Sequence, residues 1–265
     1  MDLKLAGKKA VVMGGSRGIG KAVARQLAEE GCDLAICARS EGPLRETADE
    51  IAKATGRKVY AATCDTMDPA AIKRFIASAA QELGGIDILI NSAARVGGAP
   101  GTVETIDENE VLRDFEEKVV GYLRSSREVV KYMKEKGWGR IINISGAAGR
   151  APGVNISGGA RNSATVVLTK ATANALGQYG ITANAIYPGI TLTEATLEQH
   201  RERAEREGKT VEAIIDELAS RTPIRHLINA DEVAHVIVFL CSPLALGITG
   251  EAIAVNGGNS TDVHF

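Results

Sequence analysis

The stretch AVVMGGSRGIG, from Ala10 to Gly20, constrains the fold more than any other part of the sequence. It joins a short apolar run to a segment with apolar residues at every fourth position, which is typical of a buried strand followed by an amphipathic helix. Gly14, Gly18 and Gly20 leave the backbone uncovered where a tight turn forms and where an anion can reach the amides at the positive helix end. A glycine pattern alone is a weak signal, but in this context it predicts a phosphate-binding turn.

Apolar strand-like runs alternate with amphipathic segments along the whole chain. The predicted strands are Lys9–Gly14, Asp33–Ala38, Lys58–Thr63, Ile86–Asn91, Arg140–Ser145, Ile181–Tyr187 and Ala252–Asn256. The predicted helices cover residues 18–30, 43–55, 69–83, 107–136, 160–178 and 231–241. Such alternation predicts right-handed βαβ units. The expected fold class is α/β: a single-domain, doubly wound Rossmann fold over residues 1–265, with a seven-stranded parallel sheet and helices on both faces.

Residues 194–228 interrupt this alternation and are predicted as a helical insertion before the last helix. Their most charged segment is RERAEREGK. A charge run of this kind is most simply a solvated helix face, and the alternative is a lid over a substrate site.

Composition and charge narrow the choice of partners. The net charge of −2 in 265 residues offers no basic field for nucleic acid or an anionic membrane, so a small-molecule substrate is favoured. No apolar run is long enough to span a bilayer, and no targeting segment is evident. The four cysteines form no CxxC pair, and His200, His226, His235 and His264 lack metal-ligand spacing. We therefore expect a cytoplasmic protein with reduced thiols and no metal site.

Two arginines indicate which dinucleotide is bound. In an open parallel sheet, ligands bind beyond the carboxyl ends of the strands, and the second predicted strand ends in Ala38-Arg39-Ser40. An acid at this position selects the ribose hydroxyls of NAD, whereas an arginine favours the 2′-phosphate of NADP. Arg17 in the glycine turn adds a second positive charge. Together they predict NADP(H), although either arginine alone is compatible with an ordinary surface residue.

Several segments together resemble the short-chain dehydrogenase/reductase family over essentially the whole chain. GGSRGIG resembles the family's cofactor turn, NSAA its NNAG strand end, RIINISG its serine strand, ITANAIYPGITLT its strand ending in the PG motif, and TGEAIAVNGG its last strand. The resemblance implies a cofactor site formed by Gly14, Ser16, Arg17, Gly18, Ile19, Gly20, Arg39, Ser40, Asp65, Thr66, Asn91, Ala93, Pro188, Gly189, Ile190 and Thr193. It also implies a homodimer or homotetramer formed through the two long helices.

The family's catalytic residues are matched only in part. The resemblance implies a serine, a tyrosine about thirteen residues later, a lysine four residues after that, and an asparagine on the preceding long helix. Ser145 matches the serine, but Gly158 and Asn162 stand at the tyrosine and lysine positions, and Lys118 stands at the asparagine position. Tyr132 and Lys136 satisfy the Tyr-x-x-x-Lys pattern, but they precede Ser145 and are expected at the opposite edge of the sheet.

Lys118 and Asn162 look like a reciprocal exchange of an amide and a cation across the pocket. Lys118 falls on the apolar face of its predicted helix, where a solvent-exposed lysine is not expected. Gly158 cannot replace the tyrosine as acid and is expected to leave a gap. The proton can come from Lys118, from Tyr122 on the same helix, from Tyr187, or from water. Arg161 is a candidate for binding an anionic or carbonyl oxygen, the alternative being a surface or interface arginine.

Three functions remain compatible with the sequence. The first is an NADP(H)-dependent oxidoreductase with a rearranged active site, acting on a small carbonyl or alcohol substrate. In it, Ser145 polarises the carbonyl and Lys118 replaces the usual lysine. The second is a lyase, hydrolase or isomerase on the same fold, which would convert its substrate without oxidising the nicotinamide. The third is a catalytically silent protein that binds NADP(H).

Overall fold

A computed structural model describes residues 1–150 and 154–260. Its centre is one seven-stranded sheet in the order β3-β2-β1-β4-β5-β6-β7, and every pairing is parallel. The strands are β1 (Lys9–Met13), β2 (Asp33–Ala38), β3 (Val59–Thr63), β4 (Ile88–Asn91), β5 (Gly139–Ile144), β6 (Ile181–Pro188) and β7 (Ala252–Val255). The strand order reverses between β1 and β4, which is where a doubly wound fold opens its ligand crevice. The predicted fold class is confirmed.

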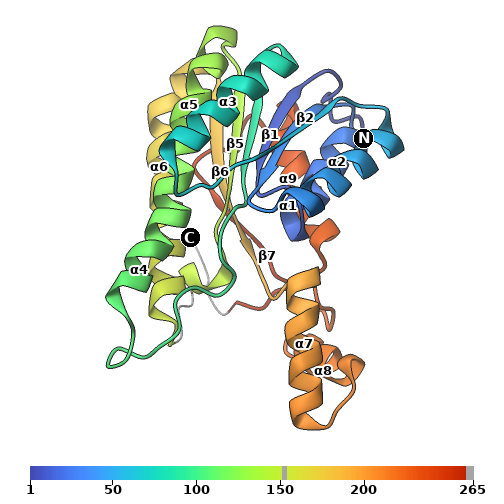
Figure 1. Ribbon diagram of the computed structural model, residues 1–265, viewed down its shortest axis with the longest axis vertical. Helices are drawn as coiled ribbons and strands as arrows, with labels where there is room; N and C mark the ends of the chain where they lie inside the picture. Colours follow the sequence, from blue (N-terminus) through green and yellow to red (C-terminus); the bar gives the residue numbers. More distant parts are fainter. Residues whose placement is uncertain (151–153, 261–265) are drawn as a thin grey trace.

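Helices cover both faces of the sheet (Figure 1). One face packs against α1 (Gly18–Glu29), α2 (Glu41–Thr55) and α9 (Ala230–Cys241), and the other against α3 (Pro69–Leu83), α5 (Gly121–Lys136) and α6 (Ile156–Leu176). The two cores are separate because successive side chains of a strand point to opposite faces. In β1, Val12 joins the first core and Val11 and Met13 join the second, so the strand is buried on both sides.

The long helix predicted over 107–136 is divided. The chain forms α4 (Glu108–Phe115), a π-helical turn η1 (Glu116–Val120) and then α5. A π-helical turn inserts an extra residue into the helix and often marks a functional site. Here it buries the consecutive charged residues Glu117 and Lys118. Periodicity alone did not predict this turn because the flanking segments keep the helical pattern.

α6 begins four residues earlier than predicted. The Asn155 side chain accepts a hydrogen bond from the Gly158 amide at 2.8 Å and so caps the helix. This cap adds Ile156 to Gly159 to the helix and fixes the backbone around Gly158.

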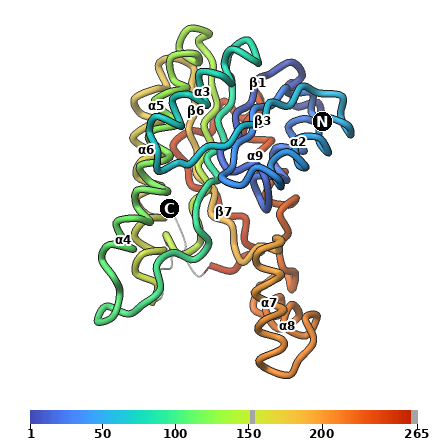
Figure 2. Tube along the Cα trace, in the orientation of Figure 1, coloured from blue at the N-terminus to red at the C-terminus, as the bar shows by residue number. Residues whose placement is uncertain are grey.

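The predicted insertion forms two helices, α7 (Glu194–Glu207) and α8 (Val211–Ala219), which extend away from the carboxyl edge of the sheet (Figure 2). A small apolar cluster that includes Ala204, Ile214 and Leu218 packs them together. Arg203 of α7 also forms ion pairs with Glu207 and with Glu217 of α8. In the described part of the chain, no helix combines the length and apolar character needed to cross a membrane.

Candidate active site

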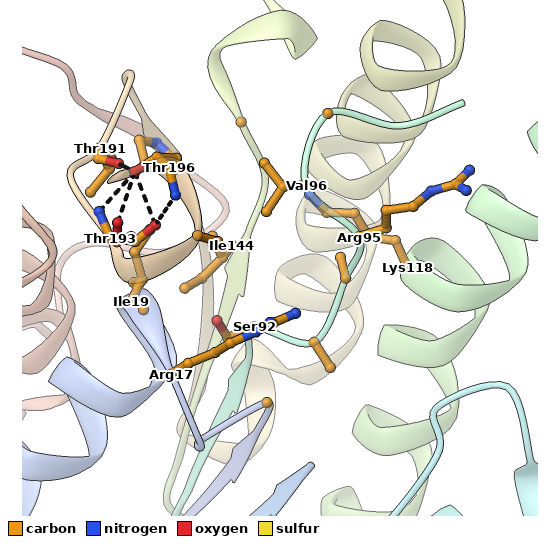
Figure 3. Close-up of a pocket in the computed structure, with 18 of the residues that line it drawn as sticks. Arg17, Ile19, Ser92, Arg95, Val96, Lys118, Ile144, Thr191, Thr193 and Thr196 are labelled. Carbon is orange, nitrogen blue, oxygen red and sulfur yellow. Dashed lines mark hydrogen bonds between the residues drawn. The ribbon is translucent and has the colours of Figure 1, made fainter. Parts of the chain in front are cut away.

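One cavity of about 830 Å³ lies at the carboxyl edge of the sheet and reaches from the glycine turn to α7. The PG turn with Thr191 and Thr193 borders one side of this cavity, and Arg95 and Lys118 border the other (Figure 3). The predicted residues that line it are Ser145, Lys118, Asn162, Tyr122, Arg161, Gly14, Ser16, Arg17, Gly18, Ile19, Arg39, Ser40, Thr66, Ala93, Pro188, Gly189, Ile190 and Thr193.

The glycine turn packs too closely for side chains. Gly14 has a φ of +84°, and a Cβ there would lie 2.7 Å from the Ala93 nitrogen. A Cβ on Gly20 would lie 2.0 Å from the Gly14 carbonyl oxygen. The turn therefore requires glycine at both positions, and it brings α1 close against β1.

The amide end of α1 already holds an anionic group. Gly18 N donates a hydrogen bond to the Glu194 carboxylate, from the first residue of α7, at 2.9 Å. A carboxylate here stands in for an oxyanion of a phosphate, because both are attracted by free amides at a helix N-terminus. The geometry thus fits a dinucleotide phosphate.

Arg17 and Arg39 both line the cavity. The Arg39 side chain is 56% exposed, and its guanidinium is 3.4 Å from the buried Glu117 carboxylate. It is therefore held at the end of β2 while remaining accessible to a ligand. One guanidinium at the end of β2 and a second in the glycine turn fit a phosphate better than a ribose diol.

Three predicted cofactor residues do not line the cavity. Gly20 packs beneath the turn, and Asp65 is exposed, where its carboxylate accepts a hydrogen bond from the Met67 amide at 3.0 Å. The Asn91 side chain is fully buried, accepts a hydrogen bond from Ser125 at 2.6 Å and donates one to Asn143 at 2.8 Å. Gly20 and Asn91 therefore lie behind the cavity wall, whereas Asp65 lies at the surface.

Lys118 and Asn162 contact each other directly. The Lys118 ammonium donates to Asn162 Oδ1 at 2.6 Å and to the Ser145 carbonyl oxygen at 2.7 Å. Because an ammonium has three hydrogens, one remains for a ligand. Burial, together with the nearby Arg161 guanidinium, places the pKa of Lys118 well below that of an ordinary lysine.

Ser145 follows β5 and binds α6. Its hydroxyl donates to the Asn162 carbonyl oxygen at 2.9 Å. Its proton must therefore turn away from this bond before the hydroxyl can polarise a ligand carbonyl. The Asn162 amide nitrogen forms no hydrogen bond with the described residues and is a second donor at this point.

Tyr122 is poorly placed as an acid. The hydroxyl donates to the Ile144 carbonyl oxygen at 3.2 Å, and burial raises the pKa of Tyr122 above its usual range. This geometry gives Tyr122 a structural contact with β5, in contrast to the predicted chemical role.

The Arg161 side chain is also held by contacts within the protein. Its guanidinium lies 3.4 Å from the Asp114 carboxylate and donates to the Arg95 carbonyl oxygen at 2.6 Å. The side chain is 3% exposed, and only its Nε lacks a partner within the described part of the chain. Arg161 therefore anchors the segment after β4 through two of its five N–H groups.

The expected gap at Gly158 is filled. A Cβ on Gly158 would lie 2.6 Å from the Gly97 carbonyl oxygen and 2.8 Å from Asn155 Oδ1. Asn155 also donates to the Gly97 carbonyl at 2.6 Å. The expectation of an open space at this position was wrong, because backbone from the segment after β4 occupies it.

Tyr132 and Lys136 lie at the other edge of the sheet. Lys136 forms an ion pair with Asp87, directly before β4, at 2.7 Å. This places the pair at the amino ends of the strands, far from the cavity-lining residues, as the order of the sequence predicts.

Comparisons with known proteins identify the family. A family model described as enoyl-(acyl carrier protein) reductase matches residues 14–260. The 3-oxoacyl-(acyl-carrier-protein) reductase of Aquifex aeolicus is 31% identical over 265 residues, covering 97% of this chain and 99% of that protein. The chain belongs to the short-chain dehydrogenase/reductase family.

Other members show the same extent of similarity. The D-beta-hydroxybutyrate dehydrogenase of Rhizobium meliloti is 32% identical over 258 residues, covering 95% of this chain and 98% of that protein. The crystal structure of L-sorbose reductase from Gluconobacter frateurii, complexed with NADPH and L-sorbose, superimposes with a TM-score of 0.95 at 28% identity, covering 99% of this chain and 100% of that one. The likeness therefore extends from the glycine turn through α7 and α8.

Sequence reasoning missed two parts of the cavity wall. One is the segment after β4, where Arg95 and Gly97 line the cavity, and the other is the face of α7 with His200 and Arg206. No motif marks the first. The second follows from helical periodicity, which divides the residues of RERAERE between different faces of α7.

Proposed function

We propose that this protein is an NADP(H)-dependent oxidoreductase that interconverts a carbonyl and an alcohol, with Lys118 as the acid. The contact between Lys118 and Asn162 carries the proposal. These are the two positions at which the sequence departs reciprocally from the family pattern, and their side chains are 2.6 Å apart. NADPH fits the glycine turn and the two arginines, and its bound nicotinamide would supply the hydride.

The residues of the chain divide the remaining work. The free N–H of Lys118 and the amide of Asn162 bind the substrate oxygen and stabilise the negative charge that develops on it. Lys118 then gives its proton to that oxygen, becomes a neutral amine and recovers a proton from water. A lysine with a lowered pKa is a better acid for this step than an ordinary lysine, because its proton is held less tightly.

Ser145 and Tyr122 act on the framework of the site. Ser145 ties α6 to β5 through the Asn162 carbonyl, and Tyr122 ties α5 to the same strand. These two bonds keep Lys118 and Asn162 on facing helices at hydrogen-bonding distance. Gly158 has no room for a tyrosine, which supports a site that works without one.

The test compares wild type with Lys118→Met, which keeps the length of the side chain without its charge. Wild type should oxidise NADPH stoichiometrically with a panel of aldehydes and ketones. The variant should lose roughly 100- to 10,000-fold in kcat, the range expected for a missing acid. The measurements are absorbance of the reduced nicotinamide and product analysis. NADPH binding, followed by fluorescence, should stay within about threefold.

The pH profile tests the same role. Only the ammonium form of Lys118 can donate, so carbonyl reduction should decline as pH rises through the lowered pKa of Lys118. The residual activity of Lys118→Met should lack this decline. An unchanged profile would contradict the acid role, and tight NADPH binding with no turnover would instead support a silent binding protein.

The proposal also covers the oligomeric state of the enzyme and its cellular compartment. Exposed apolar side chains on the long helices, including Leu112, Leu123 and Val167, support a homodimer or homotetramer, which sedimentation can test. The four buried free thiols support a reducing, cytoplasmic compartment.

A further inference from the structure

The helix α7 separates its charges between two faces. Gln199, Arg203 and Arg206 follow one another at helical spacing and line the cavity, together with His200. Glu198, Glu202 and Glu205 follow the same spacing one position earlier, and none of them lines the cavity. Within RERAERE, Arg203 and Arg206 face the cavity, whereas Arg201 and the glutamates do not line it.

Several hydrogen-bond donors on the cavity face of α7 have no partner among the described residues. Arg206 forms no ion pair or hydrogen bond with any described residue. Arg203 is paired with Glu207 and Glu217 through its Nε and Nη2, which leaves Nη1 free of described partners. His200 is 8% exposed, and its buried Nε2 has no hydrogen-bond partner among the described residues.

A buried polar atom without a partner is unfavourable, so the orphaned Nε2 of His200 points to a ligand. Burial and the neighbouring Arg203 lower the pKa of His200. A neutral imidazole can carry its hydrogen on Nε2 and donate it to an oxyanion.

This face lies beyond the part of the cavity that fits the dinucleotide phosphate. Glu194, at the start of α7, contacts Gly18, and the helix runs outward from there (Figure 1). At about 1.5 Å per residue, His200 lies roughly 9 Å and Arg206 roughly 18 Å farther along the axis. These distances separate the face from the glycine turn, while both belong to the same cavity as Lys118.

We propose that His200, Arg203 and Arg206, with Gln199, form a subsite for an anionic group of the substrate, a carboxylate or a phosphate. The substrate is then a carbonyl compound with its reacting carbon near Lys118 and its negative charge near α7. This inference rests on the proposed reductase function and specifies its substrate class. The acids of the cavity do not oppose it, because Glu117 is paired with Arg39 and Glu194 with the Gly18 amide.

Matched pairs of probes test the charge directly. Levulinate and 5-oxohexanoate are compared with their methyl esters, and dihydroxyacetone phosphate with dihydroxyacetone, at constant ionic strength. Wild type should favour the charged member by roughly 10- to 100-fold in kcat/KM, as expected for a charge-assisted hydrogen bond. Comparison of the acid pairs with the phosphate pair distinguishes a carboxylate from a phosphate.

Arg206→Gln should raise KM for the charged probes about tenfold, with kcat and the neutral probes little changed. Arg201→Gln is the matched control, because Arg201 lies on the same helix, pairs with Glu198 and does not line the cavity. Equal reduction of charged and neutral probes by wild type would overturn the subsite, as would equal losses for both in Arg206→Gln.

A binding measurement separates this inference from the reductase function. Calorimetry on the NADP+ complex, in which the phosphate site of the glycine turn is already filled, should show levulinate or dihydroxyacetone phosphate binding that weakens about tenfold in Arg206→Gln. This result together with absent turnover would refute the reductase and keep the subsite. Binding of no charged probe would refute the subsite, whatever the turnover.

Discussion

One half of the cavity is formed mainly by backbone, and the other half is formed by side chains. The half around the glycine turn consists largely of backbone, in which Gly14 and Gly20 have no room for a Cβ and Gly18 offers its amide. The half around Lys118 consists of side chains from two facing helices, and these side chains contact one another. A backbone site tolerates almost no substitution, whereas a side-chain site can exchange groups across a gap and keep its charges.

The largest effect is expected from reversing the proposed exchange between Lys118 and Asn162. Lys118→Asn and Asn162→Lys should each lose roughly 100-fold or more in kcat, because each removes the contact between cation and amide. The double variant places the lysine on α6 and the asparagine on η1, so it should recover at least about tenfold over either single variant. Steady-state kinetics of the four proteins gives the coupling.

If the double variant is no better than the product of the two single losses, the positions are independent and the exchange is not functional. Circular dichroism and NADPH binding serve as controls for folding in all four proteins.

Substitutions in the half of the cavity around the glycine turn should change the affinity for the cofactor and leave the chemical step unchanged. Arg39→Ser removes the guanidinium at the end of β2 and should weaken NADPH binding roughly 10- to 100-fold, with little effect on NADH binding. Fluorescence titration with both nucleotides measures the change. Arg45→Ser is the control, since Arg45 is an exposed residue of α2 that pairs with Glu41. Equal weakening of NADPH and NADH would contradict a 2′-phosphate contact.

The smallest effect is expected at Gly158, which packs against the segment after β4. Gly158→Ala places a Cβ against the Gly97 carbonyl and should cost about 1–3 kcal/mol of unfolding free energy. The melting temperature should fall by about 2–4 °C for each kcal/mol of unfolding free energy that is lost. Gly42→Ala, with nothing within 4 Å of its Cβ, should leave stability nearly unchanged. Equal melting temperatures for both variants would show that the segment after β4 moves to accommodate the added Cβ without loss of stability.

The sequence predicts the fold well because strands and helices repeat in a regular order, and the apolar runs of β1 and β4 are buried on both faces. It also places the glycine turn, Arg39 and Lys118 at one edge of the sheet. It does not predict the π-helical turn around Lys118, because an extra residue in a helix leaves the flanking pattern intact.

The occupied space next to Gly158 could not be predicted from the sequence, for a different reason. It depends on Gly97, which is 61 residues earlier in the chain, and on the Asn155 side chain that joins the two. Such a contact between irregular segments has no periodic signal. The hydrogen bonds of Tyr122 and Arg161 to backbone carbonyls could not be predicted for the same reason, because such carbonyls are invisible in a sequence pattern.

The bond between Glu194 and Gly18 also has a consequence for the order of events. One amide hydrogen cannot serve a carboxylate and a phosphate oxygen together, so a dinucleotide that takes this position must release Glu194. Glu194 is the first residue of α7, and its release leaves the start of this helix held by the capping box between Thr193 and Thr196. Binding of the dinucleotide therefore exchanges one contact of α7 for a contact of the ligand, while the cap of the helix stays in place.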